Sequence, residues 1–147
     1  MLIVKARKLG FAALLGLPLL VTAATQSIEV YKTATCGCCE AWIKHLRANS
    51  FRVAVHDVAD PSGMRGKMGI PDRLGSCHTA VAGGYAIEGH VPAAEIRRLL
   101  AWKPKAKGLA VPGMPAGSPG MEGPMRMSYD VLLVNEDGAT IVYKHYP

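Results

Sequence analysis

The chain has 147 residues, and its 17 lysines and arginines exceed its 11 aspartates and glutamates by a formal net charge of +6. Three of the basic residues, Lys5, Arg7 and Lys8, lie near the N-terminus, and without them 14 basic residues face 11 acidic ones, a net charge of about +3. So mild and scattered a charge argues against nucleic acid as a partner. The length suits one domain that buries a core without disulfide staples, which leaves the four cysteines free for function.

The first 24 residues have the pattern of a secretory signal peptide. The basic residues precede an apolar run from Phe11 to Val21, and Thr22-Ala23-Ala24 offers small residues for cleavage. The run has about eleven residues, well short of the roughly 20 that a membrane span needs. We therefore expect residues 1–24 to be removed and residues 25–147 to form one exported, periplasmic domain without a membrane anchor.

The rest of the chain alternates predicted strands and helices. In chain order we expect a strand at Ser27–Thr33, a helix from the CGCC segment to Asn49, a strand at Phe51–Val58, a short helix around Met64–Met68, a hairpin of Cys77–Ala82 and Tyr85–His90, a helix opened by Pro92, a loop at Gly108–Ser128, and a closing hairpin of Tyr129–Val134 and Ala139–Tyr143. This order predicts an α/β fold, a thioredoxin-like single domain with a central mixed sheet and flanking helices.

Three cysteines, Cys36, Cys38 and Cys39, lie within four residues at the predicted junction of the first strand and helix. Backbone N–H groups and the helix dipole at such a junction stabilise a thiolate and lower its pKa from about 8.5 toward neutrality. Cys36 and Cys39 have the spacing of a dithiol redox pair, but Cys38 would compete for every mixed disulfide. Three thiolates on one turn can instead converge on one ion or bridge several, and soft thiolates select Cu(I), zinc or iron–sulfur clusters.

The fourth cysteine, Cys77, is placed by the predicted hairpin. A two-residue turn at Gly83-Gly84 sets Cys77 directly opposite His90. Glu88 belongs to the same face, whereas His78 is expected on the opposite one. One sulfur and one imidazole within cross-strand reach form half of a metal site that the CGCC turn would complete. The remaining histidines are expected to be solvated: His45, His56 and His145.

The loop at Gly108–Ser128 holds four of the seven methionines, namely Met114, Met121, Met125 and Met127. Thioether sulfur is a soft, neutral ligand that favours Cu(I), and it survives oxidising conditions better than a thiol does. The alternative is that one or two of these side chains peg the loop to the domain.

The segments TCGCC, SCHTAV, GGYAIEGHVPAAEIRRLL and GLAVPGMPAGSPGME closely resemble the CopG-type family of exported bacterial proteins linked to copper resistance. The similarity runs from about Ile28 to the C-terminus. It implies a thioredoxin-like fold, a periplasmic location and copper binding. Matched by position, the family's thiolate cluster, distant cysteine, motif histidines and loop methionine fall at Cys36, Cys38, Cys39, Cys77, His78, His90 and Met114.

The sequence thus predicts a periplasmic copper-binding protein of copper resistance that holds one or several Cu(I) ions and meets other periplasmic copper-handling proteins. Mixed nitrogen and sulfur ligation would let copper cycle between oxidation states, although no catalytic residue or substrate pocket can be read. Two alternatives stay open. One is a thiol–disulfide oxidoreductase using Cys36 and Cys39, with Cys77 resolving. The other is a structural zinc site of four cysteines, or of three cysteines and a histidine.

Overall fold

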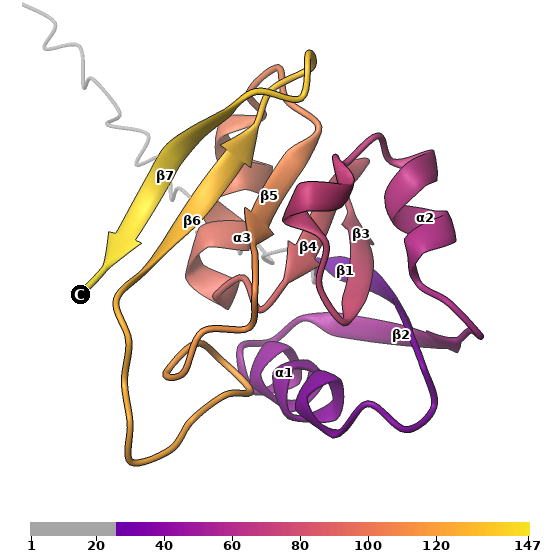
Figure 1. The fold of residues 1–147 in the computed structure, drawn as a ribbon. Helices are drawn as coiled ribbons and strands as arrows, with labels where there is room; N and C mark the ends of the chain where they lie inside the picture. The colour runs from indigo at the N-terminus through magenta and orange to yellow at the C-terminus, as the bar shows by residue number, and fades with distance from the viewer. Residues whose placement is uncertain (1–25) are drawn as a thin grey trace, which may run out of the picture.

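The computed structural model describes residues 26–147, so the predicted signal segment at 1–24 lies outside the described residues. The elements follow in the order β1 (Ser27–Lys32), α1 (Gly37–Ala48), β2 (Arg52–Asp57), α2 (Ser62–Lys67), the 3₁₀ turn η1 (Asp72–Leu74), β3 (His78–Ala82), β4 (Tyr85–Gly89), α3 (Ala93–Trp102), β5 (Gly108–Val111), β6 (Tyr129–Val134) and β7 (Thr140–Tyr146) (Figure 1). Every helix in this described stretch falls short of the length and apolarity that a membrane span requires.

The strands form one mixed sheet in the order β2-β1-β3-β4-β5-β6-β7. The β1–β2 and β4–β5 pairs are parallel, and the other neighbours are antiparallel. Helices α1 and α3 bury their apolar sides against one face of the sheet, while the segment of α2 and η1 packs a smaller cluster on the other. The α/β class, the central mixed sheet with flanking helices and the single domain are confirmed, whereas the thioredoxin-like label stays a prediction.

The predicted loop at Gly108–Ser128 is wrong in its first part. Residues Gly108–Val111 form β5, a fully buried strand that lies between β4 and β6. A strand of four residues that is followed by Pro112 and Gly113 gives little periodic signal, so only its two neighbouring strands define it. Because of β5, the closing hairpin of β6 and β7 continues the same sheet instead of forming a separate ribbon.

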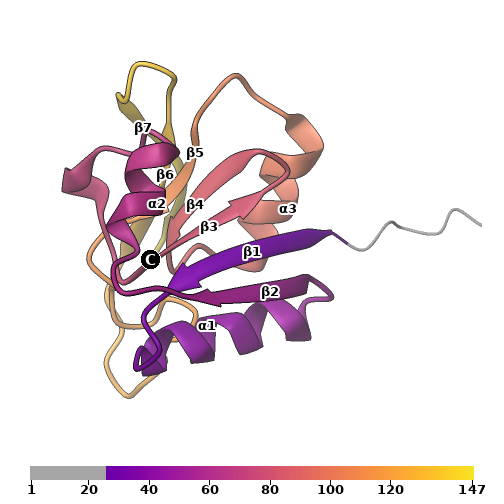
Figure 2. The same cartoon turned by 90° about the vertical axis from the view of Figure 1, so that its right-hand side faces the viewer.

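Helix α1 begins directly after Cys36 and carries the cysteine cluster on its first turn. Its buried stripe of Cys39, Trp42, Ile43 and Leu46 follows the 3.6-residue period and lies against the sheet. Figure 2 shows α1 running alongside β1 and β2, with its first turn next to the end of β1. The indole Nε1 of Trp42 donates a hydrogen bond of 2.9 Å to the Val91 carbonyl, which fixes α1 to the chain that leads into α3.

The loop that connects β5 to β6 passes over the first turn of α1. Gly120 has a φ of +88°, and a Cβ added there would lie 2.8 Å from both the Cys38 carbonyl oxygen and the Trp42 nitrogen. The close approach of these two backbones therefore requires glycine. Through it, the loop holds a fixed position beside the cysteine cluster.

We expect Gly120→Ala to destabilise the protein by about 1–3 kcal/mol more than Gly113→Ala. Both glycines have a positive φ, so both substitutions pay the left-handed backbone cost of roughly 1 kcal/mol, but a Cβ at Gly113 meets no atom within 4 Å. Denaturant unfolding of the two variants measures the difference. Equal destabilisation would show that the loop does not press on α1.

Candidate metal centre

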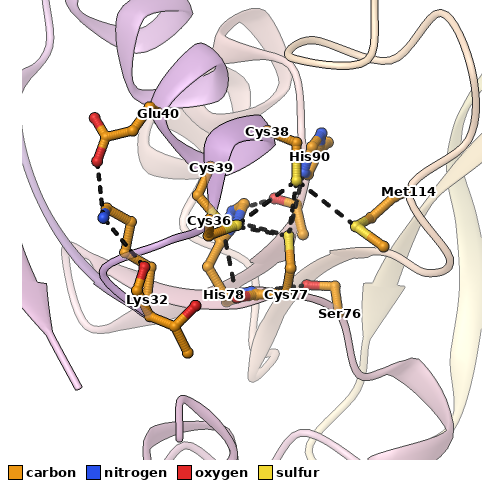
Figure 3. Close-up of a disulfide and its surroundings, with 12 residues drawn as sticks. Lys32, Cys36, Cys38, Cys39, Glu40, Ser76, Cys77, His78, His90 and Met114 are labelled. Atoms are coloured by element: carbon orange, nitrogen blue, oxygen red, sulfur yellow. Dashed lines mark hydrogen bonds and ion pairs between the residues drawn. A yellow bond between two sulfur atoms is a disulfide. The ribbon is translucent and has the colours of Figure 1, made fainter. Parts of the chain in front are cut away.

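The four cysteine sulfurs lie together where the first turn of α1 meets Cys77, the residue that precedes β3 (Figure 3). All four Sγ atoms lie within 4.8 Å of one another. Cys36 and Cys39 are joined as a disulfide, and Cys38 and Cys77 are free thiols. The Cys77 sulfur lies 3.4 Å from that of Cys39 and 3.7 Å from that of Cys38, which in turn lies 3.6 Å from that of Cys36.

A buried lysine, which the sequence analysis missed, holds the turn that carries the cluster. Lys32 ends β1 and is 2% exposed, and its Nζ lies 2.8 Å from a Glu40 oxygen and 2.9 Å from a carboxylate oxygen of Asp57. The hydrogen bonds to Glu40 and Asp57 raise the pKa of Lys32, so its ammonium group stays charged. It links the end of β1, the first turn of α1 and the end of β2. In the sequence, the alternation of Ile28, Val30 and Lys32 along β1 was the sign that the Lys32 side chain is buried.

The predicted pairing of Cys77 with His90 is confirmed. The β3–β4 register has Thr79 opposite Glu88 and Ala82 opposite Tyr85, as a turn at Gly83-Gly84 requires. One step beyond the paired residues, the Cys77 Sγ lies 3.4 Å from Nε2 of His90. The sulfur of Cys77 thus belongs both to the four-cysteine group and to a second group with His78 and His90.

The predicted face of His78, with Ala80 and Ile87, agrees with the structure, since its ring stacks on Trp42 in the core cluster that contains both. The prediction is wrong for Cys77, whose sulfur leaves the face of Glu88 and lies against α1. His78 therefore joins the same site. Its Nδ1 lies 3.5 Å from the Cys77 Sγ, and its ring stacks on that of His90 with centroids 5.3 Å apart. Strict alternation ends here because Cys77 precedes β3, and because Gly89, with a φ of +73°, turns the chain before His90.

The two buried histidines, His78 and His90, carry neutral imidazoles that can serve as metal ligands. Burial lowers the pKa of His78 to about 3, with the neighbouring His90 adding to the effect, and burial also lowers the pKa of His90. The Nε2–H of neutral His78 donates to the Gly89 carbonyl at 3.0 Å, which leaves the lone pair of Nδ1 facing Cys77. A neutral imidazole with a fixed tautomer is the form that binds a metal ion.

The thiol of Cys77 is held in its protonated form. Burial raises the pKa of Cys77 to about 12, and the nearby sulfur of Cys38 adds to the shift. A metal ligand must be a thiolate, so a metal ion that binds Cys77 displaces its proton.

Met114 reaches the cluster from the loop after β5. Its Sδ lies 3.9 Å from the Cys38 Sγ, and its backbone has a φ of +48°, which a residue with a Cβ rarely adopts. Such conformations concentrate at functional sites. Met125 and Met127 are instead 72% and 59% exposed, so neither pegs the loop to the domain.

The other histidines lie away from the cluster. His56 and His145 are exposed, as predicted, and face Glu29 and Asp130. The prediction that His45 is solvated is wrong. It is half-buried, and its Nε2 accepts a hydrogen bond of 3.1 Å from the Ala93 N–H at the start of α3. It acts as a cap for α3.

Comparisons with known proteins agree with this arrangement. Residues 74–121, which include Cys77, both buried histidines and Met114, match a family described as "Protein of unknown function, DUF411". The chain has no match among curated proteins. Two solved structures, of copper resistance protein CopG in its Form 2 and Form 1, are 47% identical in sequence. The TM-scores are 0.80 and 0.79. Each match covers 84% of this chain, and the two matches cover 99% and 98% of the respective CopG chains.

This chain belongs to the CopG family. An identity of 47% over nearly the whole length of the CopG structures shows a shared fold as well as shared descent. Within that fold, the seven residues predicted as ligands all meet at one place: Cys36, Cys38, Cys39, Cys77, His78, His90 and Met114. Soft sulfur donors with two imidazoles are the donor set that suits a soft metal ion.

Reduction of the Cys36–Cys39 disulfide is expected to strengthen metal binding strongly. With the disulfide formed, Cys38 and Cys77 are the free thiols of the cluster, and reduction adds two further thiolates. Changes around the ligands alone alter affinity by about 10–100-fold, so two additional ligands should have at least that effect.

Anaerobic competition for Cu(I) with a chromophoric chelator compares oxidised and reduced protein. A variant with Cys36 and Cys39 both replaced by serine, which cannot form the disulfide, should bind equally with and without reductant. Equal affinity and equal stoichiometry of the oxidised and reduced wild-type protein would contradict the expectation.

Proposed function

We propose that this protein binds copper as Cu(I) in the periplasm and acts in copper resistance. The observation that carries the proposal is the convergence of four cysteine sulfurs within 4.8 Å of one another, with two neutral imidazoles at one of them. Soft, polarisable donors select Cu(I) over the hard cations, and thiolates can bridge neighbouring ions. The name of the CopG relatives, copper resistance protein, supports the same reading.

The donors divide the task by position. Once the Cys36–Cys39 disulfide is reduced, the first turn of α1 offers three thiolates, from Cys36, Cys38 and Cys39, and the end of the hairpin offers a fourth, from Cys77. His90 and His78 contact the Cys77 sulfur, and the Met114 sulfur lies 3.9 Å from that of Cys38. Such an arrangement accommodates one Cu(I) or several, with thiolates shared between ions.

The wider setting of the proposal rests on the sequence. A cleaved signal over residues 1–24 would deliver residues 25–147 to the periplasm, where other copper-handling proteins would deliver or accept the metal. The presence of both sulfur and imidazole donors would let bound copper change its oxidation state. The first half of the fold, from β1 to α3, has the element order that motivates the thioredoxin-like label.

The two rival functions fit less well. In a thiol–disulfide oxidoreductase, Cys38 would compete for every mixed disulfide. Its sulfur lies within 3.7 Å of both Cys36 and Cys77, close enough to do so. A structural zinc site is expected where the metal replaces a core, whereas this domain has a buried core of its own. Insulin reduction without metal would favour the first rival, and unfolding on chelation of a colourless zinc protein would favour the second.

Replacement of Cys38 by serine is expected to lower both the Cu(I) stoichiometry and the affinity. Its sulfur is the link between Cys36, Cys77 and Met114, so no other thiolate can take its place. Anaerobic Cu(I) titration of the reduced protein, followed by sulfur-to-copper charge-transfer absorption, measures the loss. A Cys38→Ser variant with full stoichiometry and affinity would count decisively against the cluster.

Replacement of Met114 by leucine is expected to weaken Cu(I) binding, whereas Met125→Leu should leave it unchanged. Leucine keeps the bulk of methionine but has no thioether. The Met114 sulfur lies 3.9 Å from that of Cys38, whereas Met125 is 72% exposed. Competition titration of the two variants side by side gives the comparison. Equal affinities for both variants would remove Met114 from the ligand set.

A further inference from the structure

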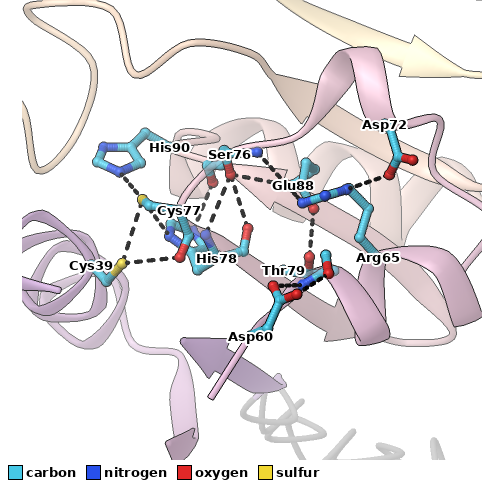
Figure 4. Close-up of polar contacts among 12 residues, drawn as sticks. Cys39, Asp60, Arg65, Asp72, Ser76, Cys77, His78, Thr79, Glu88 and His90 are labelled. Atoms are coloured by element: carbon cyan, nitrogen blue, oxygen red, sulfur yellow. Dashed lines mark hydrogen bonds and ion pairs between the residues drawn. The ribbon is translucent and has the colours of Figure 1, made fainter. Parts of the chain in front are cut away.

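A buried carboxylate lies directly behind the arm of the site that carries Cys77 and both histidines (Figure 4). Glu88 is on β4, opposite Thr79 of β3, and has no exposed surface. Burial raises the pKa of Glu88, and the hydrogen bonds from Thr79 and Ser76 act against that shift. A charged group is costly to bury, so its contacts should reveal what it does.

The hydrogen bonds of Glu88 hold the chain on both sides of Cys77 and His78. One carboxylate oxygen accepts from the Ser76 backbone N–H at 2.7 Å and from the Ser76 hydroxyl at 3.0 Å. The other oxygen accepts from the Thr79 hydroxyl at 2.6 Å. Ser76 precedes the pair of candidate ligands and Thr79 follows it, so one side chain clamps the segment that presents them.

The charge of Glu88 is balanced from α2. The Nη1 atom of Arg65 lies 3.7 Å from the carboxylate oxygen that binds Ser76, and its Nε donates to Asp72 at 3.3 Å. Arg65 is 13% exposed, so this ion pair is only partly screened by solvent. The α2 segment is thereby linked to the back of the metal site, although it contains none of the candidate ligands.

The next two residues after Glu88 complete the arm. The Gly89 carbonyl fixes the tautomer of His78, and the positive φ of Gly89 turns His90 toward Cys77. A Cβ on Gly89 would collide with the Val111 carbonyl oxygen and lie 3.1 Å from the Ser76 hydroxyl oxygen. Glu88, Gly89 and Ser76 therefore interlock, and a shift of one displaces the others.

We infer that Glu88 is a positioning residue of the metal centre, whose carboxylate holds Cys77, His78 and His90 in the geometry that binds copper. This inference rests on the proposed function. Groups behind the ligands of metal sites typically account for about 10–100-fold in metal affinity. A glutamine at this position has a single oxygen acceptor, so it cannot accept from Ser76 with one atom and from Thr79 with another.

The test compares Glu88→Gln with Glu95→Gln in the full-length mature protein. Glu95 is a matched control, because it is also a buried carboxylate, 6% exposed, that accepts from a hydroxyl (Tyr146, 3.0 Å) and pairs with an arginine (Arg98, 3.4 Å). Its partners include no candidate ligand. Anaerobic competition titration gives the Cu(I) affinity, and X-ray absorption of the copper-loaded protein counts imidazole neighbours.

We expect Glu88→Gln to bind Cu(I) about 10–100-fold more weakly than the wild type and to lose imidazole neighbours, with Glu95→Gln unchanged in both respects. A loss of thermal stability in both variants with wild-type affinity and imidazole count would show a merely structural role and overturn the inference. If the wild-type protein itself binds no Cu(I), the proposed function fails instead.

A second variant covers the case in which Glu88→Gln does not fold. Thr79→Val removes the hydroxyl donor at 2.6 Å and keeps the carboxylate, the side-chain size and the pairing with Arg65. It should weaken Cu(I) binding in the same direction by a smaller factor. If this variant binds like the wild type, Glu88 does not act on the site through the segment that it clamps.

Discussion

The contact between the Cys77 sulfur and the first turn of α1 is the interaction on which the site depends. It joins two parts of the chain that are 38 residues apart, with 3.4 Å between the sulfurs of Cys77 and Cys39. On one side of this contact, the start of the helix supplies three closely spaced cysteine sulfurs. On the other, the hairpin supplies one sulfur and two imidazoles. The helix has no imidazole among these donors and the hairpin has a single sulfur, so the packing of α1 on the sheet creates the full donor set.

The polar groups that maintain this contact are buried and paired. Lys32 fixes the turn before α1 through its ion pairs, and Glu88 fixes the chain before β3 by accepting from the Ser76 N–H. Trp42 connects the site to the main core, of which it is part, since its ring stacks on His78 with centroids 4.3 Å apart. Because Lys32 and Glu88 each have several partners, a displacement of either would leave a buried charge without its hydrogen bonds, and this gives the two segments a defined position.

The sequence was sufficient where a regular repeat extends over several residues. The stripe of α1 and the register of the β3–β4 hairpin follow from periods of 3.6 and 2, and both match the structure. It failed where regularity ends. The direction of His90 depends on the turn at Gly89, and β5 is defined by its neighbours rather than by its own four residues. The pairing of Glu88 was also out of reach, although a charge between Ile87 and Gly89 in an apolar strand was a sign of it.

The short strand β5 has a consequence for the loop methionine. Without β5, the chain between the end of α3 and the start of β6 would be one long loop, and the thioether near its middle would have no fixed position. Main-chain pairing with β4 and β6 anchors the chain as far as Val111, so Met114 sits only three residues from a fixed point, a reach of roughly 10 Å. The exposed end of the loop beyond Gly120 can therefore change in length or composition while the thioether keeps its place beside the cysteines.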